Sequence, residues 1–241
     1  MASHIVKSYD EQLRKLNDTL VRMGGVVESQ ISAAIQALTR RDPDLALATV
    51  AGDARVDELE RQVDEQVVTL LALRQPMASD LRLVVGSLRI ASDLERMADY
   101  AKNVAKRSVA LSQMTPVSIA ATLPRMGRVA QEMVKDVLDA YVARDVDKAV
   151  AVWNRDEELD ALHASLFREL VTHMMEDARN ITPATHLLFI AKNLERIGDH
   201  ATNVAEAIHF QVVGRMLSDA RPKGGEASVA VVVPGATAGD A

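Results

Sequence analysis

The sequence predicts an all-α protein made of two tandem three-helix bundles, related by an internal repeat, with a disordered C-terminal tail. Three observations favour this fold class. Aromatic residues make up only 3% of the 241 residues and apolar residues 48%, which suits helices packed through aliphatic side chains. Apolar residues recur at helical spacing along most of the chain. A polar motif near residue 95 also returns about 100 residues later.

The first half contains the pattern of three helices. A seam of apolar residues spaced by four and three runs from Tyr9 to Leu38 and predicts the first helix, with a bend at Gly24-Gly25. Asp42-Pro43 reads as an N-cap followed by a proline in the first turn, and a second helix is expected over about 43–73. The stretch 75–79 then separates it from a third helix over about 79–112.

The second half repeats this order. Two prolines and several small polar residues in 112–124 indicate a link, after which the apolar seam resumes from Leu123 to Ala140. A turn near Arg144-Asp145 opens a fifth helix that ends near Met175, and Thr182-Pro183 starts the sixth. The expected domains are 1–112 and 113–217. The Gly- and Pro-rich stretch 218–241 reads as a disordered tail.

Composition excludes several classes of function. The chain has no cysteine, so disulfides, thiolate metal sites and cysteine catalysis are ruled out. The net charge of −6 offers no overall basic surface for nucleic acid. The N-terminus lacks a signal-peptide pattern and no apolar run is long enough to span a membrane, so we expect a cytoplasmic protein without membrane insertion.

The repeated motif preserves polar residues as well as an apolar stripe. Leu-Glu95-Arg96-Met-Ala-Asp99 recurs as Leu-Glu195-Arg196-Ile-Gly-Asp199 at an offset of 100. Each copy places Glu and Asp four residues apart, on one face of a helix. The preceding helices carry similar pairs, related at an offset of 103: Asp53/Asp57 and Asp156/Asp160.

Hairpin register brings these pairs together. In an antiparallel pair of helices, residues at one level have numbers that add to a constant. Asp53 with Asp99 and Asp57 with Glu95 share a midpoint at Pro76, which lies in the predicted turn. The second half gives a midpoint between residues 177 and 178, also in a turn. The pair Glu60/Asp64 has no acids opposite it and fails this test. Each half should therefore bring four carboxylates to one level.

Four carboxylates at one level require positive charge nearby. Hard oxygen ligands suit Mg²⁺, Ca²⁺, Mn²⁺ or iron, and bridging carboxylates could hold a multinuclear cluster. Alternatively, Arg96 and Arg196 neutralise a solvated acidic face. His200 could be an extra ligand on one side, whereas Glu28 and Glu132 are better explained as exposed acids. The spacing alone leaves both alternatives open.

Catalytic motifs are missing. The chain has no Walker A loop, dinucleotide fingerprint or Gly-x-Ser-x-Gly sequence. A carboxylate-bridged di-metal enzyme would use Glu-x-x-His on paired helices. Only Glu206-x-x-His209 fits that pattern, and it has no repeat partner. We therefore expect a protein that is not an enzyme.

Several of these features together resemble the PhoU family of phosphate-transport regulators. They are the tandem three-helix units, the stretch Arg-Gln-Pro-Met-Ala-Ser-Asp-Leu-Arg at 74–82 and the two Leu-Glu-Arg motifs. The resemblance covers about residues 5–217. It implies that the acidic pairs hold metal ions, with multinuclear iron or zinc favoured and manganese or magnesium as alternatives. The implied ligands are Asp53, Asp57, Glu95, Asp99, Asp156, Asp160, Glu195 and Asp199.

The resemblance also implies a function and partners. PhoU-like proteins are negative regulators of the phosphate-starvation response. They are thought to link the ATPase subunit of the phosphate ABC transporter to a membrane sensor histidine kinase. This chain would then be a homodimeric adaptor that reaches the inner face of the membrane only through its partners. A helical scaffold without metal is the main alternative, and a di-metal enzyme is a weaker one.

Overall fold

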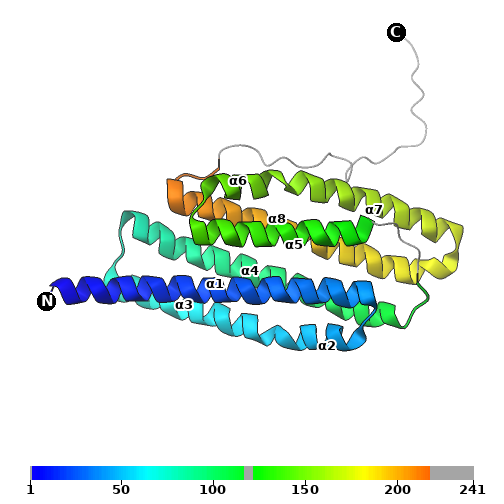
Figure 1. Cartoon of the computed structure of the whole chain (residues 1–241), viewed down its shortest axis with the longest axis horizontal. Helices are drawn as coiled ribbons and strands as arrows, with labels where there is room; N and C mark the ends of the chain where they lie inside the picture. Colours follow the sequence, from blue (N-terminus) through cyan, green and yellow to red (C-terminus); the bar gives the residue numbers. More distant parts are fainter. Residues whose placement is uncertain (1, 117–121, 218–241) are drawn as a thin grey trace, which may run out of the picture.

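The computed structural model describes residues 2–116 and 122–217, and within these ranges every regular element is a helix (Figure 1). The predicted fold class is confirmed. The tail prediction for 218–241 lies outside the described residues. The helices, in chain order, are α1 (Ala2–Arg40), α2 (Pro43–Gly52), α3 (Ala54–Arg74), α4 (Ala78–Ser112), α5 (Thr122–Ala143), α6 (Val146–Asn154), α7 (Asp156–Glu176), a 3₁₀ turn (Ala178–Asn180) and α8 (Ile181–Val213).

The two halves repeat one design. The first consists of α1, the α2–α3 pair and α4, and the second consists of α5, the α6–α7 pair and α8. The predicted second and fifth helices are each divided by a single residue, Asp53 and Arg155 respectively. Both dividing residues keep right-handed helical backbone angles, so each division is a local break in an otherwise continuous helical rod.

The turns confirm the predicted capping chemistry. The Asp42 carboxylate accepts a hydrogen bond from the backbone N–H of Leu45 at 3.0 Å, with Pro43 in the first turn of α2. Asp145 does the same for Lys148 at 3.0 Å at the start of α6. These side chains satisfy donors that a helix start would otherwise leave unpaired. The two halves therefore begin their second helical rods in the same way.

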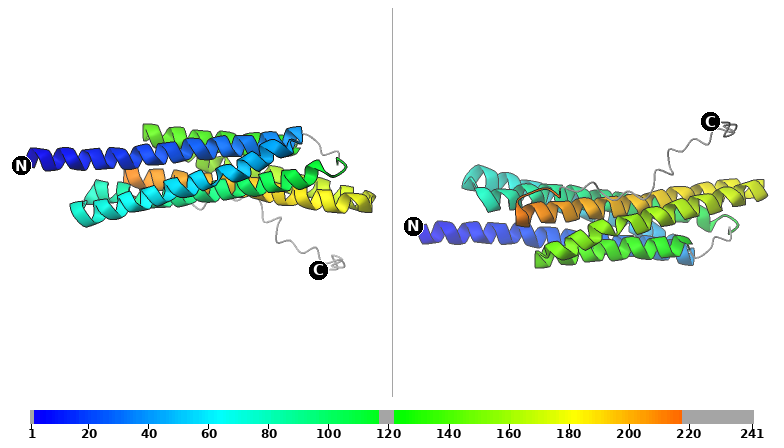
Figure 2. Two further views of the ribbon diagram at one scale, coloured as in Figure 1. Left: turned by 90° about the horizontal axis from the view of Figure 1, so that it is seen from below. Right: turned by 90° about the horizontal axis from the view of Figure 1, so that it is seen from above.

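The centre of the molecule is the antiparallel pair α4 and α8, the two helices that carry the repeated motif. Residues early in α4 meet residues late in α8, because the Gln211 amide donates to the carbonyl of Leu83 at 3.1 Å. At the other end, Arg107 of α4 lies 3.5 Å from the ring nitrogen of His186. The two units therefore lie side by side, as Figure 2 shows, with α1 extending past its neighbours at the N-terminal end.

The core is aliphatic, as the composition predicted. The apolar seam of α1 is fully buried from Leu16 to Ile31, and the seam of α5 is buried from Leu123 to Ala140. The predicted bend at Gly24-Gly25 is wrong in one respect, because α1 runs through both glycines without interruption. Gly24 instead allows close packing, since a Cβ there would lie 2.5 Å from the Leu138 side chain of α5. Gly127 of α5 faces Ile35 of α1 in the same manner, at 3.2 Å.

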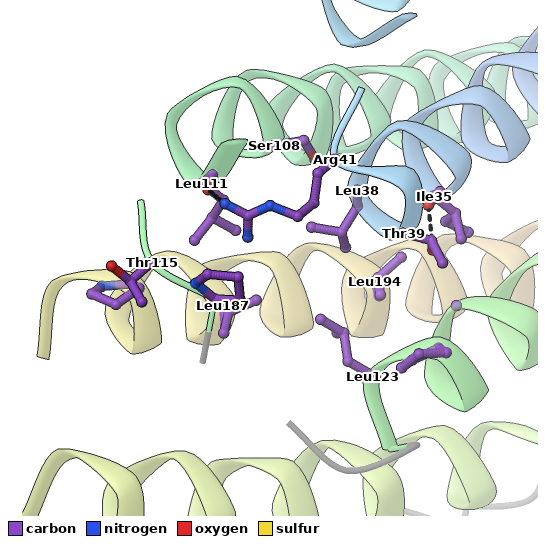
Figure 3. Close-up of a pocket in the computed structure, with 14 residues that line it drawn as sticks. Ile35, Leu38, Thr39, Arg41, Ser108, Leu111, Thr115, Leu123, Leu187 and Leu194 are labelled. Atoms are coloured by element: carbon purple, nitrogen blue, oxygen red, sulfur yellow. Dashed lines mark hydrogen bonds between the residues drawn. The ribbon is translucent and has the colours of Figure 1, made fainter. Parts of the chain in front are cut away.

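A cavity of about 250 Å³ lies where the two units meet (Figure 3). Its lining is mostly apolar, with Leu38, Leu111, Leu187 and Leu194 among its residues, and it contains none of the eight predicted acids. Arg41 borders it. Its guanidinium donates to the carbonyl of Leu111 at 2.6 Å and also to those of Ser112 and Met114, so it caps the C-terminal end of α4.

The turn at Arg41 offers a matched test of this cap. Arg41 and its repeat equivalent Arg144 both have left-handed backbones, with φ of 54° and 53°, but Arg144 is exposed. Arg41→Ala should lower the free energy of unfolding by about 1.5–3 kcal/mol more than Arg144→Ala, because only Arg41 donates charged hydrogen bonds to helix-end carbonyls. Urea denaturation measures both variants, and equal losses would contradict the capping role.

Candidate acidic site

The structure places the eight predicted acids along the contact between the broken helical rod and the motif helix of each unit. Asp53 and Asp156, at the two breaks, are buried, with exposed fractions of 6% and 2%. Glu95, Asp99, Asp160, Glu195 and Asp199 are half-buried, and Asp57 is exposed. One acid of each set is therefore buried, which differs from the uniformly solvated acidic face that the sequence alone allowed.

In the first unit, one predicted pair of the register, Asp53 with Asp99, is confirmed by a shared partner. The ammonium of Lys102 contacts carboxylate oxygens of both Asp53 and Asp99, the latter at 2.8 Å. The Gln30 amide of α1 donates to the other oxygen of Asp53 at 3.2 Å. These hydrogen bonds to Asp53 and Asp99 raise the pKa of Lys102, so its ammonium stays protonated. We name Asp53, Asp57, Glu60, Glu95, Asp99 and Lys102 the first cluster.

Glu60 belongs to this cluster although the register test rejected its pair. Burial raises the pKa of Glu60, and the nearby charges of Asp64 and Asp57 raise it further. Burial also raises the pKa of Glu95 to about 7, with the charges of Asp99 and Glu60 adding to the effect. The register test compared only residues at the same height on the two helices. A long side chain on a helix also covers the neighbouring turn, so it can reach residues at another height.

In the second unit, α7 approaches α8 closely at Gly198. A Cβ at this position would lie 2.3 Å from the Leu159 side chain, and 3.6 Å from a carboxylate oxygen of Asp156. Glycine in the second motif copy therefore allows α7 to bring Asp156 against α8. We name Asp156, Asp160, His163, Glu195 and Asp199 the second cluster. Burial lowers the pKa of His163, opposed by the charges of Glu195 and Asp160, so its imidazole favours the neutral form.

In the first cluster, Lys102 is a closer counterion than the arginine of the motif. Arg96 reaches Glu95 only at 3.8 Å and is 59% exposed, while Arg196 lies over the ring of Tyr100 at 5.5 Å. In the second cluster the ammonium of Lys192 contacts Glu195. Sequence reasoning missed Lys102, Lys192 and His163. The sequence marks these three positions only as differences between the two halves, because the equivalent residues are Thr202, Ser92 and Glu60.

The remaining candidates have partners outside the two clusters. His200 faces α4, where its ring nitrogen is 2.7 Å from Asp93, and the Asn203 amide donates to the same carboxylate at 3.2 Å. Glu132 pairs with Arg155. Glu206 accepts a hydrogen bond from the Trp153 indole at 3.0 Å. His200 is thus part of the contact between the two units and not an extra ligand of the second cluster.

The residues as they stand do not form a closed metal site. In the ranges 2–116 and 122–217, no three carboxylate or imidazole side chains converge closely enough to hold an ion. The donor chemistry of the two clusters nevertheless differs. The first contains an ammonium that already holds two of its carboxylates. The second combines carboxylates with an imidazole, a donor set that suits zinc and iron as well as manganese.

The raised pKa of Glu95 predicts how stability depends on pH. In the metal-free protein the folded state keeps the Glu95 proton up to about pH 7, whereas the unfolded chain releases it near 4.5. Ionisation therefore costs folding stability as pH rises through this window. Glu95→Gln, which mimics the protonated form, should raise the urea midpoint more at pH 8 than at pH 4. The exposed Glu65→Gln is the control, and equal shifts at both pH values would contradict the assignment.

Comparison with known proteins identifies the family. Residues 20–108 and 123–208 each match the PhoU domain. The chain is 51% identical over 224 residues to the phosphate-specific transport system accessory protein PhoU homolog of Caulobacter vibrioides, covering 92% of this chain and 97% of that relative. The corresponding Rhizobium meliloti protein is 47% identical, with 92% and 94% covered.

Solved structures agree with this family assignment. The crystal structure of PhoU from Pseudomonas aeruginosa matches with a TM-score of 0.83 and 38% identity, covering 86% of this chain and all (100%) of that one. The phosphate transport system regulatory protein PhoU from Streptococcus pneumoniae matches with a TM-score of 0.80 and 28% identity, covering 87% and 99%. The second of these is described as a regulatory protein, and the prediction that this chain is not an enzyme agrees with a family of regulators. Both repeats and nearly the whole described chain are covered by these matches, and the protein belongs to the PhoU family.

Proposed function

We propose that this protein is a negative regulator of phosphate uptake and of the phosphate-starvation response. The observation that carries the proposal is similarity over nearly the full length of both chains, 92% and 97%, to a protein named as an accessory of phosphate-specific transport. In this role it acts as an adaptor between the ATPase subunit of the phosphate ABC transporter and a sensor histidine kinase. The prediction of a homodimer belongs to the same proposal.

The fold supports an adaptor role. Within the described ranges, none of the helices combines the length and the apolar character that a bilayer span requires. The hairpin turns of the two units lie towards opposite ends of the molecule (Figure 1). Each turn carries a strongly exposed apolar residue, Met77 at 80% and Met175 at 83%. Both turns are therefore accessible to a partner, one towards each end of the molecule.

The proposal includes metal binding by the acidic pairs. The residues that would hold the ions are Asp53, Asp57, Glu95, Asp99, Asp156, Asp160, Glu195 and Asp199. Carboxylates can bridge neighbouring ions, so iron or zinc in multinuclear form is the expected content, with manganese or magnesium as alternatives. A bound cation would offset the cost of placing several like charges on one face of a helix pair. It would also tie each broken rod to its motif helix.

Genetics tests the regulatory role. Deleting the gene should leave phosphate-starvation genes switched on in phosphate-rich medium, and a plasmid copy should restore repression. A transcriptional reporter on a phosphate-starvation promoter measures this. Normal repression in the deletion strain, with no second PhoU-family gene to compensate, would contradict the proposed function.

Metal analysis tests the metal-binding part of the proposed function. Protein purified without chelator should contain metal, and Asp57→Ala combined with Asp160→Ala should lose most of it, because the pair removes one ligand from each cluster. The matched control is Asp44→Ala with Asp147→Ala, which removes two exposed and repeat-equivalent acids from the first turns of α2 and α6. Plasma mass spectrometry measures the content. Metal-free wild-type protein would favour the alternative of a helical scaffold without metal.

A further inference from the structure

The side of the α4–α8 pair that faces away from α1 and α5 carries a row of arginines. α1 packs on α4, α5 packs on α8, and α1 contacts α5, so these two helices cover one side of the pair (Figure 2). On the other side, three guanidiniums reach across the contact between α4 and α8, and each lies over an aromatic ring of the opposite helix. The pairs are Arg89 with Phe210 at 5.9 Å, Arg196 with Tyr100 at 5.5 Å and Arg107 with Phe189 at 4.0 Å. We name these six residues the arginine row.

The spacing of the arginine row is one that a helix can match. Arg196 lies over Tyr100, which comes 11 residues after Arg89 and 7 residues before Arg107 on α4. At about 1.5 Å per residue, these steps are about 16 and 10 Å. Seven and 11 residues are each close to a whole number of helical turns. A straight helix laid along the row can therefore present one side chain to each guanidinium from a single face.

The positive charge of the row is not neutralised by the acids nearby. In the part of the chain that the structure describes, the ion pairs formed by arginines include none of the three from the row. Asp93, which lies on α4 between Arg89 and Tyr100, is 2.7 Å from the His200 ring nitrogen and accepts a hydrogen bond from Asn203 at 3.2 Å. The three guanidiniums are therefore available to carboxylates from outside, on a chain whose net charge is −6.

The row also offers apolar surface. Phe189 is 50% exposed at one end of it. Next to Arg89, towards the other end, is a hollow of about 320 Å³ whose lining includes Ala207 and Met216. Arginine and aromatic residues are enriched where proteins bind one another, because they combine a large contact area with charge or a polar group. The row therefore suits a helix that carries acids and apolar side chains on one face.

The surroundings of the row favour a single helix over a wider polyanion. Asp99 directly precedes Tyr100, and Glu195 directly precedes Arg196. Duplex nucleic acid would bring its phosphates close to these carboxylates as well as to the guanidiniums, and the like charges would repel. A helix, which is about 10 Å wide, can cover the row alone.

We propose that the arginine row is the docking surface for an acidic amphipathic helix of a protein partner. This inference rests on the adaptor role of the proposed function and deepens it, since it says where one partner binds and by what chemistry. Carboxylates of the partner helix, spaced by 11 and 7 residues, pair with the three guanidiniums. Its apolar side chains cover Phe189 and enter the hollow next to Arg89. The aromatic rings already hold the guanidiniums in place, so docking orders few additional side chains.

Fluorescence anisotropy with the purified full-length chain tests the proposal. The probe is a labelled synthetic helical peptide in which glutamates spaced by 11 and 7 residues share a face with leucines. A second peptide has glutamine in place of each glutamate. The wild type should bind the glutamate peptide about tenfold more tightly than the glutamine peptide, and added salt should weaken only the former.

Charge reversal in the row should abolish this difference. Arg89→Glu combined with Arg196→Glu should weaken binding of the glutamate peptide by about tenfold or more. The matched control is Arg22→Glu combined with Arg128→Glu, which makes the same charge change at two exposed arginines of α1 and α5. This control should bind as the wild type does. Circular dichroism verifies folding, and if the reversal does not fold, Arg89→Gln with Arg196→Gln should still remove most of the salt dependence.

Three results of the binding experiment would overturn the inference. The first is equal binding of the two peptides by the wild type. The second is equal affinity of the folded row variant and the control variant for the glutamate peptide. The third is tighter binding of a labelled DNA duplex than of the glutamate peptide, which would make nucleic acid the better occupant.

The deletion strain separates this inference from the proposed function. On a plasmid, the row variant should fail to restore repression of the phosphate-starvation reporter, while the control variant should restore it. Full repression by the row variant in a deletion strain that is otherwise derepressed would overturn the inference and leave the proposed function standing. Unchanged repression in the deletion strain itself would overturn the proposed function, and the adaptor role of the row with it.

Discussion

The structure depends on carboxylates held inside a helical bundle. Asp53 and Asp156 lie at the breaks of the two helical rods, with 6% and 2% exposure, in a largely aliphatic core. Placing a carboxylate in such surroundings costs several kcal/mol unless positive charge and hydrogen bonds compensate. In the first unit, Lys102 and Gln30 supply that compensation and at the same time join α4 and α1 to the rod. Asp53 is therefore both a potential metal ligand and a residue that connects the rod to α1 and α4.

The antiparallel packing of α4 and α8 places this chemistry twice in one molecule. The face of each motif helix that carries Glu and Asp turns towards its own broken rod. A neighbouring face carries Asp93, Tyr100, His200 and Asn203, which meet between the two units. One helical motif thus serves a site within its unit and a contact with the other unit. This double use explains why the repeat preserves polar residues as well as an apolar stripe.

Much of this arrangement could be predicted from the sequence. Helical spacing, the Asp42-Pro43 cap and the prolines located the helices and turns, and the hairpin register correctly paired Asp53 with Asp99. The breaks at Asp53 and Arg155 were missed because neither involves a proline or glycine at the dividing residue. Lys102 was missed because a repeat argument selects what two copies share, and this lysine is present in only one. Glu60 was rejected because the register test paired only residues at the same height of the two helices. It did not allow for a long side chain that reaches a neighbouring turn.

The central claim is that the Lys102 ammonium compensates the buried Asp53 carboxylate and so joins α4 to the α2–α3 rod. Urea denaturation of Lys102→Met tests it most directly, because this change removes the charge and keeps much of the length of the side chain. We predict a loss of about 2 kcal/mol or more in the free energy of unfolding at pH 7, and a much smaller loss for Lys106→Met, an exposed lysine of the same helix. Equal losses in the two variants would contradict the account.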